Sequence, residues 1–173
     1  IGIVGDAGNV LADMIEAWTS RNLSTDKTAL AEWWRQIDIW RSRKGFAYRP
    51  DSQLIKPQHA IERLYALTRG HDTYITTEVG QHQMWAAQYF HFDDPNRWMT
   101  SGGLGTMGYG LPAALGVQIA HPDSLVIDIA GDASVQMTMQ EMSTAIQYDA
   151  PIKIFILNNE WMGMVRQWQQ LLH

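Results

Sequence analysis

Two polar clusters each follow an apolar run that has the length and composition of a buried strand. Gly131-Asp132-Ala133-Ser134 comes after the run at 125–130, and Asn158-Asn159 comes after the run at 152–157. A helix predicted over about 138–148 makes this a strand–helix–strand unit, whose right-handed crossover brings both clusters to the carboxyl edge of one sheet. Open α/β sheets bind ligands in the crevice at that edge.

The residue types in these clusters suit a phosphate held together with a metal ion. Asp132 offers a carboxylate and Asn159 an amide oxygen, and Mg²⁺ takes a few such oxygen ligands together with phosphate oxygens and water. The backbone N–H groups of Ala133 and Ser134 precede a helix and can bind phosphate directly. An ordinary strand-to-helix turn, with a capping Asp132 and a turn-forming asparagine pair, explains the same residues equally well.

A glycine-rich loop offers a second candidate site. The segment from Gly103 to Gly108 has the G-x-G-x-x-G spacing of dinucleotide-binding loops, and a helix is predicted after it over 111–120. Asp128 follows at about the distance of the acidic residue that binds the ribose. However, Pro95-Asn96-Arg97-Trp98 precedes the loop where a strand is required, and Asp128 lies inside an apolar strand. The sequence therefore argues against a nicotinamide cofactor.

Other catalytic chemistries lack their residues. The chain has no cysteine, and its six histidines show no metal-binding spacing, so neither a zinc site nor a thiol nucleophile is expected. Only His82, next to Gln81, lies near the predicted end of a strand. No G-x-S-x-G motif occurs, and Ser134 has no evident base partner.

The elements around these clusters alternate between strand and helix. A strand is predicted at 73–77 and helices at 57–68 and 81–89, which together indicate an α/β domain with a mostly parallel sheet flanked by helices. Towards the N-terminus, a strand at 1–4, a helix capped by Asn9 and a helix over about 26–43 are predicted. Residues 44–56 lose periodicity and form a predicted linker, so that 1–43 are expected to be the end of a second α/β domain.

Composition limits the class of protein. With 173 residues, 46% of them hydrophobic, and a net charge of −5, the chain is long enough for a real core and too acidic for non-specific nucleic-acid binding. No apolar run reaches the length of a membrane span. The chain begins at Ile1 inside the predicted strand, and we therefore expect it to be a fragment of a longer protein.

The polar clusters resemble a known cofactor motif. Gly131-Asp132-Ala133-Ser134 followed by Asn158-Asn159 is similar to the thiamine-diphosphate motif G-D-G…N-N, with Ala133 in place of a glycine. The blocks at 78–85, 100–112 and 159–169 sharpen this likeness. Jointly, the four blocks resemble the catalytic large subunits of the acetolactate synthase (acetohydroxyacid synthase) family over essentially the whole chain.

The resemblance implies a set of binding residues. Asp132 and Asn159 would bind Mg²⁺ through their side chains, and Trp161 would do so through its backbone carbonyl. The substrate pocket would be bordered by Met164, Val165 and Trp168. Residues implied to contact thiamine diphosphate are Val79, Gly80, Gln81, His82, Gly105, Met107, Gly131, Asp132, Ala133, Ser134, Asn159, Gly163, Met164 and Val165. The catalytic glutamate of the family is expected upstream, from the partner subunit, so none is expected here.

The resemblance also implies an activity and an organisation. The reaction would be decarboxylation of pyruvate and ligation to a second 2-keto acid, pyruvate or 2-ketobutyrate, in branched-chain amino-acid biosynthesis. Residues 1–43 would end the middle, flavin-associated domain, and 57–173 would form most of the C-terminal thiamine-diphosphate domain. FAD, a homodimer or higher homo-oligomer, and a small regulatory subunit are implied by the family alone.

Two alternatives to this function remain open. The chain could belong to another thiamine-diphosphate-dependent decarboxylase or oxidase of 2-keto acids, or it could be a non-catalytic cofactor-binding module. No nucleic-acid or membrane partner is expected. The expected location is the bacterial cytoplasm, or an organelle if a transit peptide precedes the sequence.

Overall fold

The computed structural model describes residues 2–50 and 53–172, and the chain divides into two compact units at Ala47 and Tyr48. The unit up to Ala47 contains the helices α1 (Ala7–Ser20) and α2 (Lys27–Ser42), neither of which buries a residue. No strand occurs in residues 2–47, so the strand predicted at 1–4 is wrong for its described residues, while Ile1 lies outside them.

The cap of α1 also differs from the prediction. Asp6, not Asn9, is the N-cap: its Oδ1 accepts a hydrogen bond of 3.1 Å from the backbone N–H of Asn9. Both residue types are good caps, and the aspartate comes first in the chain, so the helix begins three residues earlier than predicted. In and next to the predicted linker, residues 43–50 and 53–56 form neither helix nor strand.

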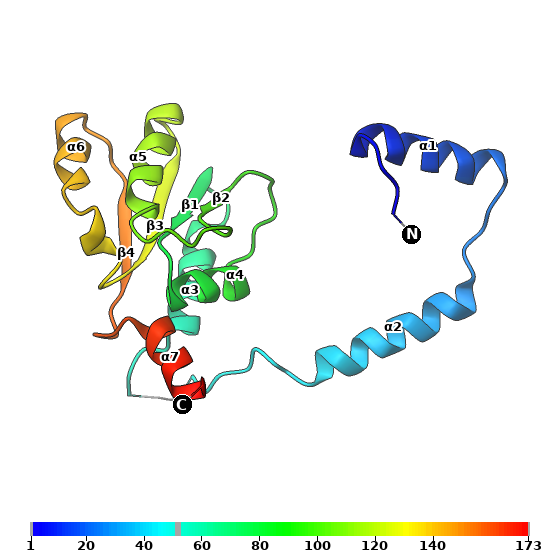
Figure 1. Cartoon of the computed structure of the whole chain (residues 1–173), viewed down its shortest axis with the longest axis horizontal. Coiled ribbons are helices and arrows are strands. Elements are labelled where there is room, and N and C mark those ends of the chain that lie inside the picture. The colour runs from blue at the N-terminus through cyan, green and yellow to red at the C-terminus, as the bar shows by residue number, and fades with distance from the viewer. Residues whose placement is uncertain (1, 51–52, 173) are drawn as a thin grey trace. The chain divides into compact units, whose positions relative to one another are not determined.

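The second unit is an α/β domain around a four-stranded, all-parallel sheet (Figure 1). Its strands are β1 (Thr73–Thr77), β2 (Trp98–Thr100), β3 (Leu125–Gly131) and β4 (Lys153–Leu157), and their order in the sheet is β2-β1-β3-β4. The predicted fold class of this domain is therefore confirmed. Its helices are α3 (Pro57–Thr68), α4 (Gln81–Tyr89), α5 (Gly110–Ala120), α6 (Glu141–Gln147) and α7 (Gly163–Leu172), with a 3₁₀ turn η1 (Val135–Met137).

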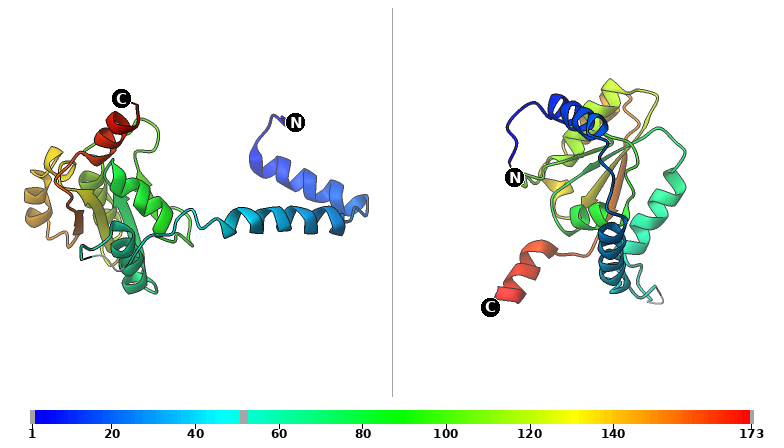
Figure 2. Two further views of the ribbon diagram at one scale, coloured as in Figure 1. Left: turned by 90° about the horizontal axis from the view of Figure 1, so that it is seen from below. Right: turned by 90° about the vertical axis from the view of Figure 1, so that its right-hand side faces the viewer.

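Three local predictions need correction. Strand β2 was missed, because it is only three residues long and follows Pro95 and Asn96, which signal a turn. The helix predicted over 138–148 is shorter in the structure: α6 begins at Glu141, and the 3₁₀ turn η1 ends before the predicted range. Helix α7 was not predicted; it buries no residue and extends away from the sheet (Figure 2, right).

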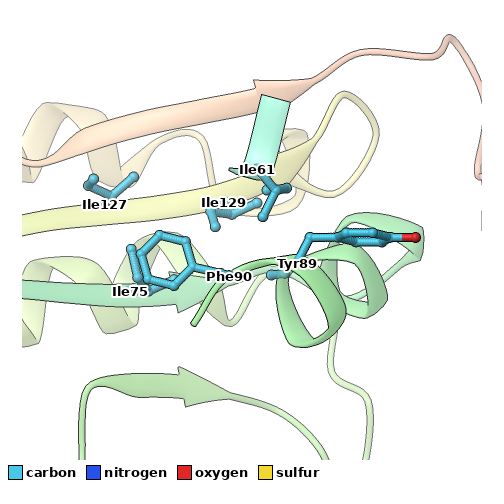
Figure 3. Close-up of a cluster of buried hydrophobic side chains, with 7 residues drawn as sticks. Ile61, Ile75, Tyr89, Phe90, Ile127 and Ile129 are labelled. Carbon is cyan, nitrogen blue, oxygen red and sulfur yellow. The ribbon is translucent and has the colours of Figure 1, made fainter. Parts of the chain in front are cut away.

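Each face of the sheet is covered by different helices. Ile75, Ile127 and Ile129 point to one face, where they pack with Ile61 of α3 and Tyr89 of α4 (Figure 3). The opposite face is covered by α5, whose Leu111, Ala114 and Leu115 are buried, and α6 packs next to α5. Successive residues of a strand face opposite sides, so Thr76 and Asp128 lie on the α5 face.

Helix α5 approaches the sheet more closely at its first residue than a side chain would allow. A Cβ on Gly110 would lie 2.3 Å from Oδ1 of Asp128 and 2.6 Å from the backbone nitrogen of Glu78. Gly116 of the same helix has open space around it. The two glycines therefore have different roles, since only the first is required by packing.

We expect Gly110→Ala to lower the free energy of unfolding by about 3 kcal/mol, since backbone and a buried carboxylate would have to move. Gly116→Ala, the matched control, should raise it by about 0.5–1 kcal/mol, because alanine favours a helix interior. Urea unfolding followed by circular dichroism measures both. Equal effects of the two substitutions would contradict the close packing at Gly110.

Candidate cofactor-binding site

Strand order brings the two polar clusters together. The helix after β1 (α4) and the helix after β3 belong to connections that run in opposite directions across the sheet, so the strand order reverses between these neighbours. Ligands of open α/β sheets bind outside the carboxyl ends of the strands at such a point. The segments that meet here are 78–82 after β1, 132–134 after β3 and 158–163 after β4.

A cavity of about 240 Å³ lies at this edge of the sheet. Every residue that the sequence predicted to contact the cofactor lines it, and so do the predicted metal ligands. Trp168 does not line it; this residue is on α7, one turn after Met164, and its side chain is exposed. Three further lining residues were not predicted, although two belong to the conspicuous blocks of the sequence: Trp85, Leu157 and Met162.

The predicted metal ligands lie at one rim of the cavity. Because Gly131 pairs with Leu157, the residues that follow β3 and β4 are neighbours, and Oδ1 of Asp132 lies 3.4 Å from the backbone nitrogen of Asn159. Oδ1 of Asn159 accepts a hydrogen bond of 3.1 Å from the backbone N–H of Trp161, which turns the chain back over the site. One carboxylate, one amide oxygen and nearby backbone carbonyls form an oxygen donor set of the type that Mg²⁺ prefers.

We next asked whether other side chains of the described residues could form a metal site. No group of three His, Cys, Asp or Glu side chains that could hold a metal occurs in residues 2–50 and 53–172. Any metal at this rim would therefore need amide or backbone oxygens in addition to Asp132. Ala133 does not have a positive φ, so alanine replaces the motif's glycine without backbone strain.

His82 forms the floor of the cavity between two glycines. Its ring is buried and lies so close to Gly131 that a Cβ there would be 2.8 Å from Nδ1. Its Nε2 lies 3.4 Å from Oγ of Ser134, which also accepts a hydrogen bond from the backbone N–H of Gly131. Burial lowers the pKa of His82 to about 4, although the backbone of Glu78 and the charge of Asp132 act in the opposite direction. The ring is therefore neutral at pH 7.

Gln81 connects the cavity to α7. Its Oε1 accepts a hydrogen bond of 3.3 Å from Nδ2 of Asn159, and its Nε2 donates one of 3.0 Å to Gln167. A Cβ on Gly163 would lie 2.0 Å from the same Oε1. These contacts fix the start of α7, which carries Met164 and Val165, at the mouth of the cavity.

The dinucleotide interpretation fails for a different reason from the one given by the sequence. A strand, β2, does precede the glycine loop directly, so that part of the argument is wrong. However, the backbone N–H groups of Gly108 and Leu111 donate hydrogen bonds to the carboxylate of Glu78. The start of α5, where a pyrophosphate would bind, is thus occupied by a side chain.

Comparison with known proteins decides the family. Residues 78–173 match the family described as "Thiamine pyrophosphate enzyme, C-terminal TPP binding domain". The chain belongs to this family. Thiamine pyrophosphate is another name for thiamine diphosphate, so the TPP-binding domain and the cavity at the carboxyl edge agree in the ligand they predict.

The similar proteins that carry curated names are acetolactate synthase subunits. The chain is 50% identical over its full length to the acetolactate synthase isozyme 3 large subunit of Escherichia coli (strain K12), and 47% identical to the acetolactate synthase large subunit of Haemophilus influenzae. It is 52% identical, over 83% of its length, to the mitochondrial acetolactate synthase catalytic subunit of Saccharomyces cerevisiae. The chain spans 30% of the two bacterial relatives and 21% of the yeast protein.

Across residues 2–50 and 53–172, every helix is too short or too polar to traverse a lipid bilayer.

The buried histidine of this TPP-binding domain gives a direct test of its electrostatics. We expect the ring of His82 to titrate near pH 4 in NMR spectra, with the signal assigned by its loss in His82→Gln. Because this folded-state pKa is below the usual 6.5, the unfolded chain binds more protons between pH 6.5 and 4, and the free energy of unfolding falls as the pH decreases through that range. A midpoint near 6.5 would contradict the burial of the His82 ring as the cause of its lowered pKa.

Proposed function

We propose that this chain is the C-terminal part of an acetolactate synthase catalytic subunit and that it holds the diphosphate end of thiamine diphosphate together with Mg²⁺. The observation that carries this proposal is the gathering of all predicted cofactor residues around one cavity. High identity to acetolactate synthase subunits over the whole chain supports the choice within the family. The proposed reaction joins pyruvate, after loss of CO₂, to a second pyruvate or to 2-ketobutyrate.

At the polar end of the cavity, we assign residues to Mg²⁺ and to the diphosphate. Asp132, Asn159 and the backbone carbonyl of Trp161 would hold Mg²⁺, whose charge offsets that of the diphosphate. The neutral ring of His82 and the amide of Gln81 would donate hydrogen bonds to phosphate oxygens. Backbone N–H groups of Ala133 and Ser134 would do the same at the start of η1.

The opposite end of the cavity is apolar. Gly105 lets the backbone approach the cofactor, and Met107 would hold it in a bent conformation against Met164 and Val165. When bound, thiamine diphosphate supplies the carbon nucleophile and the electron sink of the reaction. The apolar side chains exclude water from the reacting carbon, which protects it from premature protonation.

Other parts of the proposal lie outside the cavity. Residues 1–43 would belong to the flavin-associated middle domain, with FAD bound elsewhere in the subunit, and 57–173 to the cofactor domain. The catalytic glutamate would come from the partner subunit of a homo-oligomer, to which a small regulatory subunit could bind. The location would be cytoplasmic in a bacterium or organellar in a eukaryote.

The metal assignment predicts that Asp132→Asn weakens Mg²⁺-dependent binding of thiamine diphosphate more than about tenfold, as expected when a metal site loses a ligand's charge. Isothermal titration at fixed Mg²⁺ measures this effect on the chain itself. Asp123→Asn, an exposed change away from the cavity, is the control and should bind as the wild type does. Equal binding by both variants would remove Asp132 from the metal site.

The substrate assignment predicts that Trp168→Leu in the full-length subunit changes the ratio of acetohydroxybutyrate to acetolactate formed from mixed keto acids, at least severalfold, and leaves cofactor affinity unchanged. The neighbouring Gln169→Ala should leave the ratio as it is. An unchanged ratio for Trp168→Leu would show that α7 does not select the second keto acid. Release of CO₂ without either product would instead indicate a decarboxylase.

A further inference from the structure

Two buried carboxylates behind the cavity are not used by the proposed function. Glu78 directly follows β1, and Asp128 lies in the middle of β3; both are 0% exposed. Neither lines the cavity. They lie on the α5 face of the sheet, on either side of the close approach at Gly110, whose missing side chain leaves room for Asp128.

Glu78 is well satisfied as an anion. Its Oε2 accepts a hydrogen bond of 2.6 Å from the backbone N–H of Gly108, and its Oε1 accepts one of 3.1 Å from that of Leu111. The nearby backbone N–H groups of Gly110 and Tyr109 also act to lower its pKa. Burial raises the pKa of Glu78, but these donors at the start of a helix favour its charged form.

Asp128 is poorly satisfied as an anion. Its Oδ1 accepts one hydrogen bond, of 3.1 Å, from the hydroxyl of Thr76, and its Oδ2 has no partner in the described part of the chain. The neighbouring strand β4 places Ile154 beside it, and Gly110 of α5, which has no side chain, lies next to its Oδ1. Burial and the charge of Glu78 raise the pKa of Asp128 to about 7, and Glu78 is the only described titratable group whose charge acts on it.

Two adjacent buried carboxylates cannot both be charged at low cost, so a proton belongs on the one with fewer donors. We propose that Glu78 is a positioning residue for the glycine loop, residues 101–109, and that Asp128 carries the one proton of the pair, so that loss of this proton loosens the loop and weakens thiamine diphosphate binding. This inference rests on the proposed function, because the loop supplies Gly105 and Met107 to the cavity.

Other side-chain hydrogen bonds also involve the described loop. Nε2 of Gln83 donates to the carbonyl of Ser101, the backbone N–H of Thr106 donates to Oγ of Ser101, and Oγ1 of Thr138 donates to the carbonyl of Gly108. Gly105 and Gly108 both have positive φ, so the backbone between them adopts a conformation that tertiary contacts must maintain. The hydrogen bond from the backbone N–H of Gly108, one residue after Met107, to Glu78 connects this part of the loop to the residue that directly follows β1.

The diphosphate end provides an internal comparison. It is formed by residues outside the glycine loop, so a loosened loop should weaken binding of thiamine diphosphate and spare that of inorganic pyrophosphate with Mg²⁺. In Glu78→Gln, the amide NH₂ group faces backbone donors, and at least one hydrogen bond is lost. We expect tenfold or greater loss of thiamine diphosphate affinity with little change for pyrophosphate, and Glu16→Gln, in an exposed position, should change neither.

Asp128→Asn keeps the size of the protonated acid but cannot lose a proton. The ratio of wild-type to Asp128→Asn affinity for thiamine diphosphate should therefore fall about tenfold between pH 6 and 8, the change in the protonated fraction of a group with a pKa of about 7. Ionisation of the ligand itself cancels in this ratio. A constant ratio would overturn the proton assignment.

Hydrogen–deuterium exchange at the amides of Gly108 and Leu111 tests the anchor without any ligand. Faster exchange in Glu78→Gln than in Glu16→Gln is expected, and equal exchange would overturn the positioning role. If the wild-type chain binds neither thiamine diphosphate nor pyrophosphate, the proposed function fails and the cofactor part of this inference fails with it. Normal binding by the wild type together with equal binding by Glu78→Gln overturns the inference alone.

Discussion

Strands β1 and β3 are neighbours in the sheet, but the chain leaves them in opposite directions, towards α4 on one face and towards η1 and α6 on the other. A crevice opens where the two connections separate, and open α/β sheets bind their ligands there. The segments around His82, Asp132 and Asn159 meet there because β4 extends the same parallel sheet. Strand order therefore places the segments of the site together, and the individual side chains then determine what the site can bind.

The degree of burial of each residue sets the electrostatic character of the site. His82 lies against the backbone of Gly80 and Gly131, and burial keeps its ring neutral. A neutral imidazole can donate one hydrogen bond and accept another, whereas the positive charge needed next to a diphosphate would have to come from a metal ion. Asp132, on the more exposed rim, is placed to bind that ion. The division between a neutral floor and a charged rim follows from the depth of each residue in the cavity.

A good part of this arrangement could be read from the chain alone. The strands at 73–77 and 125–130 and the helices at 57–68 and 81–89 were predicted from the sequence, and their structural bounds agree closely with the prediction. Polar residues at strand ends then had to share one edge of the sheet. The failures are local: β2 is too short to show periodicity, and the first helix had two good capping residues, of which the earlier one is used.

The sequence by itself placed the polar clusters after β3 and β4 at one edge of the sheet, since the rules of parallel sheets convert places along the chain into places in space. The family resemblance, and not those rules, supplied the glycine loop and the start of α7 as further parts of the site. The sequence could not determine that Glu78 caps the start of α5 or that Asp128 lacks a partner for one oxygen, because those contacts join residues about 30 and 50 positions apart through side-chain packing. Ionisation states depend on burial and on neighbouring charges, which are properties of the folded chain. Motifs therefore specified the ligand, and the tertiary structure decided which groups near it carry charge.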